Sequence, residues 1–245
     1  MSEAVLEVSG LVKDYRGLRP LRLRELSIQP GEQVALLGFD QPAAEVFINL
    51  VTGATLPDEG RIRIFGRDTS EIRDSTEWLD VVDRFGIVSE RAPLLESFSV
   101  LQNLAMPFSL EIDPMSDELR AQAASLGCAV HLGDALDRRI GDLEPAARLR
   151  ARLGRALALK PEMVLFEHPS AALQRGEESR VGQELRKIVQ ESRPGPAGPP
   201  AALTLTADKD FALSIANRVL ALEPATGRLT DQRRGWFFGR GTASL

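Results

Sequence analysis

The sequence predicts an α/β fold that combines a parallel β layer with an antiparallel one. An apolar run at 34–37 is followed by a tight loop and an apolar-periodic stretch, which predicts a strand, a loop and a helix. Two more apolar strands, at 163–166 and 202–206, flank a helix expected over about 176–191, and strands that alternate with helices form parallel layers. Alternation of apolar and polar residues predicts the antiparallel strands, at 4–8, 21–28 and 60–68.

The sequence also predicts two further helices, another strand and a closing hairpin. An apolar run at 85–88 predicts another strand, and residues 116–127 predict a helix that begins at a Ser cap and stops at a Gly. A helix expected over 146–159 places leucines on one face and arginines largely off it, so the arginines are expected to form a solvated face. Residues 217–229 predict a closing strand and hairpin.

The pattern suggests a single domain in three parts. We expect an α/β core at 1–89 and 155–230, a helical subdomain at 90–154, and a C-terminal tail at 231–245. The chain has 245 residues, which suits one large α/β domain with an insertion. The tail carries Trp236, Phe237 and Phe238, which either dock on the core or meet a partner.

Composition excludes several function classes. The net charge of −5 gives no reason to expect nucleic acid or an anionic membrane surface as a direct partner. Cys128 is the only cysteine, and His131 and His168 are the only histidines, so we expect no disulfide within the chain and no metal site. The acidic start and the lack of an apolar run of roughly 18 residues predict a cytoplasmic protein that reaches a membrane only through a partner.

The loop after the strand at 34–37 has the frame of a phosphate-binding loop. Such loops follow the pattern GxxxxGK[ST], in which the glycines allow backbone N–H groups to surround a polyphosphate, the lysine meets its charge and the hydroxyl binds magnesium. Gly38 fits the first glycine. Ala43, Ala44 and Glu45 stand at the second glycine, the lysine and the hydroxyl. The frame is present without its chemistry, so an ordinary βα turn remains an alternative.

The helix after this loop is expected to begin on its own side chains. Asp40 or Gln41 can cap it, and Pro42 suits its first position because no N–H is needed there. Glu45 would place a carboxylate in the first turn and repel a phosphate.

Taken in order, residues 4–230 resemble the ATP-binding subunit of an ABC transporter. Tyr15 falls where that family stacks an aromatic ring on adenine, and QPGEQVALLG leads into the P-loop. The other matching stretches are FGIVSERAPLLESFSVLQNLAMP at the Q-loop, IGDLEPAARLRARLGRALALKPEMVLFEHPSAAL at the signature helix, acidic strand and D-loop, and LTLTADKDFALSIANRVLAL at the switch.

The resemblance implies a P-loop NTPase-like (RecA-like) core with an antiparallel β layer and an inserted helical subdomain. It also implies ATP and Mg as cofactors, and pairing with a second copy or with another ABC ATP-binding subunit. A transmembrane permease would dock in a groove around residues 89–108.

The departures from the family are systematic. Glu90 replaces the Q-loop glutamine, and Glu167 replaces the magnesium-side aspartate. His168 stands at the catalytic glutamate, Gln174 at the D-loop aspartate and Ala207 at the switch histidine. The signature LSGGQ is replaced by Leu143, Glu144, Pro145, Ala146 and Ala147. Hydrolysis in this family depends on positioning and charge stabilisation around Mg and the γ-phosphate. The groups that supply both have changed.

Glu144-Pro145-Ala146-Ala147 repeats the pattern of Gln41-Pro42-Ala43-Ala44. We expect the side chain of Glu144 to cap its helix, so that capping replaces the ligand at both helix starts, although neutral drift is an alternative. His168 could act as a general base, but a structural histidine with its hydrogen bonds satisfied is the preferred interpretation. Tyr15 is either a relic or a stacking residue.

These observations give a leading hypothesis and two alternatives. The first is a catalytically degenerate pseudo-ATPase that binds no cofactor tightly and docks on a permease as scaffold or regulator. The second is an active subunit that hydrolyses ATP with Mg and energises transport. The third is a free-standing soluble binding protein.

Overall fold

The computed structural model describes residues 3–192 and 198–232 and contains two β-sheets. The first is antiparallel, with strand order β2-β1-β4-β5, and consists of β1 (Leu6–Lys13), β2 (Leu21–Ile28), β4 (Glu59–Ile64) and β5 (Arg67–Asp68). The prediction for β2 is confirmed, whereas β1 extends beyond the expected 4–8. Ser9 and Gly10 interrupt the alternation, but a shift in the pairing of β1 with β4 accommodates them, so the strand continues.

The second sheet carries the loops of the candidate site. Its strand order is β10-β9-β3-β8-β7-β6, and all its pairings are parallel except that of β9 with β10. The strands are β3 (Gln33–Leu37), β6 (Phe85–Val88), β7 (Met163–Glu167), β8 (Ala201–Thr206), β9 (Arg218–Glu223) and β10 (Arg228–Asp231). The predicted parallel layer and closing hairpin are thus confirmed. Because parallel strands end at one edge, the loops after β3, β6, β7 and β8 lie together.

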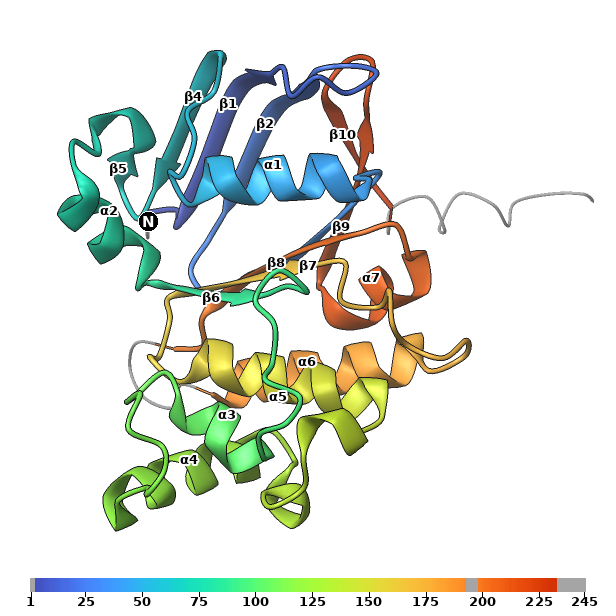
Figure 1. Cartoon of the computed structure of the whole chain (residues 1–245). Helices are drawn as coiled ribbons and strands as arrows, with labels where there is room; N and C mark the ends of the chain where they lie inside the picture. Colours follow the sequence, from blue (N-terminus) through green and yellow to red (C-terminus); the bar gives the residue numbers. More distant parts are fainter. Residues whose placement is uncertain (1–2, 193–197, 233–245) are drawn as a thin grey trace, which may run out of the picture.

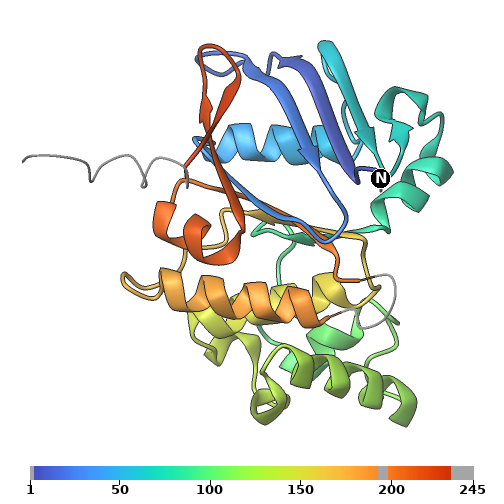
Figure 2. The ribbon, with the colours of Figure 1, turned by 180° about the vertical axis from the view of Figure 1, so that it is seen from behind.

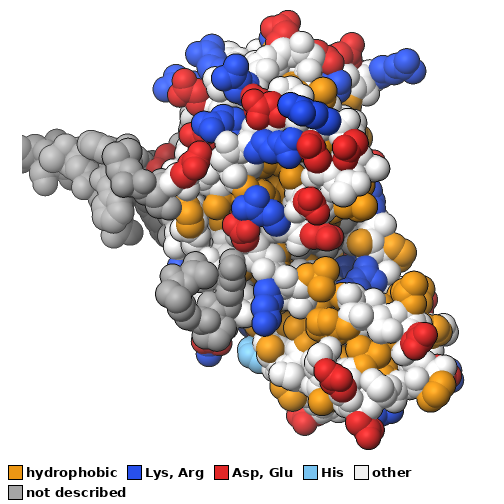
Figure 3. Space-filling model, turned by 90° about the vertical axis from the view of Figure 1, so that its left-hand side faces the viewer, with side chains coloured by type: hydrophobic (Ala, Val, Ile, Leu, Met, Phe, Trp, Pro, Cys, Tyr) orange, Lys and Arg blue, Asp and Glu red, His pale blue; other side chains and the backbone are white. Residues whose placement is uncertain are grey.

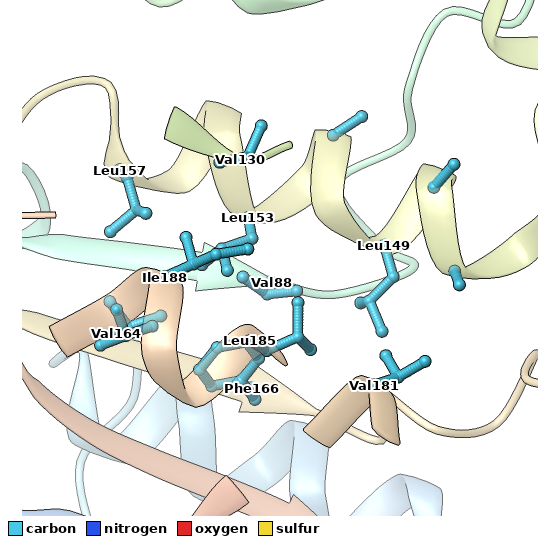
Figure 4. Packing of buried hydrophobic residues seen from close by; sticks show 14 of the residues in the cluster. Val88, Val130, Leu149, Leu153, Leu157, Val164, Phe166, Val181, Leu185 and Ile188 are labelled. Atoms are coloured by element: carbon cyan, nitrogen blue, oxygen red, sulfur yellow. The ribbon is translucent and has the colours of Figure 1, made fainter. Parts of the chain in front are cut away.

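Helices cover both faces of the second sheet (Figures 1 and 2). Helix α1 (Gln41–Val51) lies between the two sheets, where Phe39 and Phe47 pack in one apolar cluster with residues of both sheets. On the opposite face lie α5 (Pro145–Leu157), α6 (Glu178–Glu191) and α7 (Lys209–Ile215). Figure 4 shows Leu149 and Leu153 of α5 meeting Leu185 of α6 above the sheet.

The remaining helices are α2 (Ser75–Val82), α3 (Val100–Ala105) and α4 (Asp117–Ala129), with short 3₁₀ turns at Thr69–Glu71, Gly133–Ala135 and Ile140–Asp142. The Ser116 side chain caps α4 as predicted, by accepting from Leu119 N, but the helix continues past Gly127, which packs against Leu136 and Leu104. The subdomain boundary expected at residue 154 falls inside α5. Helix α2 was not predicted.

Two further expectations concern membrane spans and the aromatic residues of the C-terminal tail. Within residues 3–192 and 198–232, no helix is both long and apolar enough to span a bilayer. The aromatic residues Trp236, Phe237 and Phe238 lie outside the described residues.

Candidate functional site

The loop after β3 begins with a required glycine. Gly38 has φ +93°, and a Cβ there would lie 2.9 Å from the carbonyl oxygen of Leu222. The carboxylate of Asp40 then accepts a hydrogen bond from Ala43 N at 2.9 Å and caps α1. Since Asp40 is the cap, Pro42 is the second helical residue rather than the first, and Glu45 lies beyond the first turn. We expected Pro42 at the first helical position and Glu45 in the first turn, and both expectations were wrong.

A buried carboxylate lies beside this helix start. The Glu167 side chain, at the end of β7, has 0% exposure. Its Oε1 accepts from Gln41 Nε2 at 2.6 Å, so Gln41 contacts β7 instead of capping α1. Its Oε2 accepts from Ser89 Oγ at 2.8 Å. A buried charge needs an opposite charge as well as neutral donors.

Arg91 supplies that opposite charge. Its Nε and Nη2 donate to Glu167 Oε2 at 3.0 and 2.8 Å, and its Nη1 lies 3.3 Å from Glu45 Oε1. One guanidinium therefore bridges the carboxylates at the family's magnesium-side and hydroxyl positions. Arg91 was not singled out from the sequence, although it stands three residues after β6, the sheet neighbour of β7.

The segment 89–93 is also attached to α5. Glu90, at the Q-loop position, receives a hydrogen bond from Arg152 Nη2 at 2.6 Å. Arg155 donates to the carbonyl oxygens of Ala92 and Pro93 at 2.6 and 2.8 Å. Burial lowers the pKa of Arg155, and the nearby charge of Arg152 lowers it further. The expectation that these arginines form a solvated face was wrong, because they hold backbone and carboxylate oxygens.

The start of α5 differs from that of α1. Glu144 occupies the cap position and is exposed, but its side chain accepts no backbone hydrogen bond, so the predicted cap was wrong. Pro145 is the first helical residue, and Leu143, Ala146 and Ala147 are buried. Arg148 instead donates to the carbonyl oxygens of Leu143 and Gly141, at 2.9 and 2.6 Å.

The residues after β7 and β8 include three positions that are catalytic or nucleotide-binding in the family. His168 has φ +44°, and its Nε2 is buried without a hydrogen-bond partner among the described residues. The expectation of a satisfied structural histidine was therefore wrong for this atom. Ala207, at the switch position, is exposed, and Gln174, at the D-loop position, is exposed too.

Tyr15 lines a hollow of about 530 Å³ together with Gly38, Pro42 and Leu222. Burial of the ring raises the pKa of Tyr15, and the nearby carboxylate of Asp40 raises it further. The structure thus places Tyr15 next to the degenerate loop, as the resemblance implies. It brings Gly38, Asp40 and Tyr15 around one hollow, while Gln41, Glu45, Ser89, Arg91 and Glu167 form a separate polar cluster.

The groups that would meet Mg and a polyphosphate are engaged with one another. Pro42 has no N–H, Ala43 N is bonded to Asp40, and Ala44 is a fully buried methyl. Glu45 and Glu167 are both held by Arg91. Within residues 3–192 and 198–232, no three His, Cys, Asp or Glu side chains are placed to hold a metal ion. The donor set does not fit a magnesium nucleotide.

A known family matches the part of the chain that runs from β2 to the end of β7. The model of the family described as ABC transporter matches residues 21–171, more than half of the chain. The chain belongs to the ABC transporter ATP-binding family. ABC ATP-binding subunits work with membrane permeases and form dimers.

Individual ABC proteins resemble the chain over most of its length. It is 29% identical to the sulfate/thiosulfate import ATP-binding protein CysA of Methylococcus capsulatus over 89% of this chain and 60% of CysA. The chain thus spans about 60% of the length of that relative. It is 28% identical to the lipoprotein-releasing system ATP-binding protein LolD of Pseudomonas syringae pv. tomato over 94% of this chain and 98% of LolD.

A solved ABC cassette confirms the predicted fold class. The structure of CbiO1 from Clostridium perfringens, described as part of the ABC transporter complex CbiONQ, superimposes with a TM-score of 0.77 at 19% identity. The match covers 97% of this chain and 92% of CbiO1.

Proposed function

We propose that this ABC subunit has lost ATP hydrolysis and acts in the cytoplasm as a scaffold or regulator docked on a membrane permease. The observation that carries the proposal is the bridge from Arg91 to Glu167 and Glu45. A tethered guanidinium pairs with the two carboxylates that flank the region where the family binds magnesium, and its charge balances that of the buried Glu167. The carboxylate that is withdrawn from water thus has its opposite charge from within the chain.

The missing groups support the same conclusion. Phosphoryl transfer in P-loop proteins depends on a lysine that holds the phosphates, a metal that neutralises developing charge, and a residue that orients the attacking water. The first position is Ala44, whose methyl group is buried. The others are occupied by Glu45, Glu90, His168 and Ala207.

The second half of a family site, the signature, has changed as well. Glu144 presents an exposed carboxylate where a phosphate of a partner's nucleotide would lie. Two negative charges a few ångströms apart in a partly desolvated interface cost on the order of 1 to 4 kcal/mol. A pair formed with an intact ABC subunit would therefore have a fault in each of its two sites.

A second candidate function is an active ATPase subunit. It is favoured by the hollow beside Tyr15 and by the ATP-binding relatives that match nearly the whole chain. The two candidates differ in whether the chain binds Mg-ATP.

The deciding experiment is equilibrium binding of Mg-ATP to the purified chain, combined with thermal unfolding. We expect no binding at millimolar Mg-ATP and no change in Tm. A ligand at 100 times its Kd stabilises by about 2.7 kcal/mol, a shift of several degrees. LolD of Pseudomonas syringae pv. tomato, assayed alongside, is the positive control. A Tm shift with Mg-ATP that adenosine does not reproduce would favour the active subunit.

The permease would dock beside the segment 89–108, as the resemblance implies, on the part of the chain that we propose is the helical subdomain (90–154). Exposed apolar side chains lie in and next to this segment, with Leu95 38% and Leu110 84% exposed. Figure 3 shows hydrophobic side chains gathered over the lower half of the face that includes this region. Because Glu90, Arg91, Ala92 and Pro93 are held from both sides, docking would meet a fixed surface.

A further inference from the structure

One segment between a strand and a helix is bonded to its surroundings along most of its length. Residues 89–99 follow β6 and lead to α3, and Figure 1 shows the chain passing α5 on the way. We name these residues the 89–99 segment. Its first half is bonded to β7 and to α5, and its second half to α3 and to the turn before α5. Surface loops with few such bonds are mobile, and this segment has many.

The bonds to β7 involve a buried charge. Ser89 Oγ and Arg91 Nη2 both donate to Glu167 Oε2 at 2.8 Å. The Ser89 hydroxyl also accepts from Arg91 N at 3.0 Å, which fixes the backbone between the two side chains. Because the Glu167 side chain is 0% exposed, movement of the segment away from β7 would leave a buried carboxylate without its opposite charge, which is strongly destabilising.

The bonds to α5 involve a charge of the opposite sign. The half-buried Arg155 donates to the carbonyl oxygens of Ala92 and Pro93 at 2.6 and 2.8 Å. In the described part of the chain, no carboxylate forms an ion pair with Arg155, so its guanidinium depends on these two oxygens. Movement of the segment away from α5 would remove them. The segment therefore satisfies two withdrawn charges on opposite sides of it, and displacement in either direction costs free energy.

The second half of the segment is bonded to other elements. Asn103 of α3 is 0% exposed; its Oδ1 accepts from Leu95 N at 2.8 Å, and its Nδ2 donates to the carbonyl oxygen of Leu95 at 3.0 Å. Ile140 N donates to the carbonyl oxygen of Phe98 at 3.0 Å. Leu94, between the two halves, is buried at 6% exposure. A hinge needs residues whose backbone angles are free to change, and this segment leaves few of them.

The chain returns from α4 to the sheet through α5, which offers no hinge either. The helix runs through 13 residues, Pro145–Leu157, without a break. Leu149 and Leu153 pack in the apolar cluster above the sheet, as Figure 4 shows. At the start of the helix, Arg148 holds the carbonyl oxygen of Leu143 at 2.9 Å. Hinges occur in loops and at the ends of elements, and both kinds of position are bonded here.

We infer that this protein has no hinge between its sheets and the helices α3 and α4, so that the surface around residues 89–108 keeps one position whether or not a ligand is present. Leu95, which is 38% exposed on that surface, lies on backbone that Asn103 holds. A partner docked there would be held in place, and no movement would pass to it from the degenerate loop. The inference rests on the proposed function only for the identity of that partner.

The test measures the distance between two spin labels in the full chain by pulsed electron paramagnetic resonance. One label is attached to Cys128, the only cysteine, which is exposed in α4. The other is attached to Glu25→Cys, at an exposed position of β2. Dilution with unlabelled chain removes distances between copies. We expect one narrow distance distribution that Mg-ATP does not change.

Variants release the segment from its two sides. Arg91→Ala with Glu167→Gln removes the bonds to β7 without leaving a buried charge, and Arg155→Met removes the bonds to α5 while it keeps the bulk of the side chain. The combination of all three changes should widen the distance distribution by about twofold or more. Each release alone should widen it less, because the other side still holds the segment.

The matched control is Arg138→Met, which removes an arginine bond of the same kind, to the carbonyl oxygen of Asp142, outside the segment. Its distribution should stay as narrow as that of the unaltered chain. Thermal unfolding of every labelled variant establishes that it folds, and the single releases serve if the combination does not.

A broad or double distribution in the unaltered chain would overturn the inference, and so would a shift of the distance with Mg-ATP. A narrow distribution in folded release variants would do so too, since other contacts would then hold the helices. Equal widening in the control would show that any lost arginine bond loosens the fold, against a specific role of the segment. If Mg-ATP binds and the distance stays the same, the proposed function fails and this inference stands.

Discussion

The starts of α1 and α5 share a sequence pattern but not a mechanism of stabilisation. In Gln41-Pro42-Ala43-Ala44 the cap is the preceding residue, Asp40, whose carboxylate reaches Ala43 N at 2.9 Å. In Glu144-Pro145-Ala146-Ala147 the cap position is Glu144 itself, and its side chain accepts no hydrogen bond. The two helices therefore begin one residue apart within the same pattern, with proline second in α1 and first in α5.

The difference shows why a cap is a matter of side-chain length as well as of sequence position. Aspartate, asparagine and serine place an oxygen where it meets the N–H groups of the first turn, whereas glutamate is one methylene longer. Both cap residues have extended backbone, with ψ 173° at Asp40 and ψ 157° at Glu144, so the backbone does not distinguish them. At α1 the side chain of Gln41 donates to the buried Glu167, whereas at α5 the carboxylate of Glu144 stays exposed to solvent.

The largest loss of stability should come from the buried Glu167 carboxylate beside the start of α1, when its partner Arg91 is removed. Arg91→Ala leaves the Glu167 carboxylate buried with neutral donors only, and should lower the free energy of unfolding by about 3 kcal/mol. Urea unfolding measures this. Adding Glu167→Gln to Arg91→Ala should recover most of the loss because it removes the buried charge.

The matched control is Lys187→Ala, which breaks an exposed pair with Glu191 (66% and 63% exposed) and should cost less than about 0.5 kcal/mol. An Arg91→Ala loss as small as that of Lys187→Ala would mean that the bridge does not stabilise the fold, and would remove the main support for the proposed function.

The next effect tests the cap of α1. Asp40→Ala should lower the free energy of unfolding by about 1 kcal/mol, and Asp40→Asn should cost only a few tenths because asparagine caps equally well. Thermal and urea unfolding of both variants give the comparison. Equal losses would show that the charge, rather than the capping hydrogen bond, matters at this helix start.

The corresponding change at α5 should have little effect. Glu144→Ala should alter the free energy of unfolding by less than about 0.5 kcal/mol, since no capping bond is lost. Glu144→Asp should stabilise by about 0.5 to 1 kcal/mol, because the shorter side chain can cap the helix. A loss of 1 kcal/mol or more in Glu144→Ala would mean that Glu144 caps α5, as Asp40 caps α1.

The smallest effect concerns the charge at the start of α1. Tyr15 is the only tyrosine, so absorbance at high pH reports its ionisation alone. Its pKa is raised above the ordinary value of 10, first by burial and then by Asp40. The negative charge of Asp40 disfavours the tyrosinate, so Asp40→Asn should move the pKa of Tyr15 down toward that value. An unchanged titration would mean that Asp40 does not act on the ring.

The sequence was sufficient for most of the fold because its signals were local. Apolar strands at β6, β7 and β8 and the Ser116 cap of α4 depend on residues next to one another in the chain. The parallel layer followed from the alternation of strands with helices, whereas the order of its strands was not predicted. Helix α2 was missed because it is short and only Val81 is buried.

The candidate site was harder to predict because its contacts are not local. The degenerate positions followed from the resemblance, but the role of Arg91 depends on two strands being neighbours in the sheet. The arginines of α5 were assigned to solvent because a helical pattern shows which residues leave the core, and does not show that the segment 89–93 lies against them.

The bridge at Glu167 also bears on the order of events in folding. Its hydrogen-bond partners Gln41, Ser89 and Arg91 are 126, 78 and 76 residues away in the chain. Gln41 follows β3, whereas Ser89 and Arg91 both follow β6. Contacts between distant parts of a chain form late, since the entropy of closing large loops is lost before they are made. Until β3, β6 and β7 are assembled, Glu167 is a solvated carboxylate like any other. Its withdrawal from water therefore marks the completion of the central sheet.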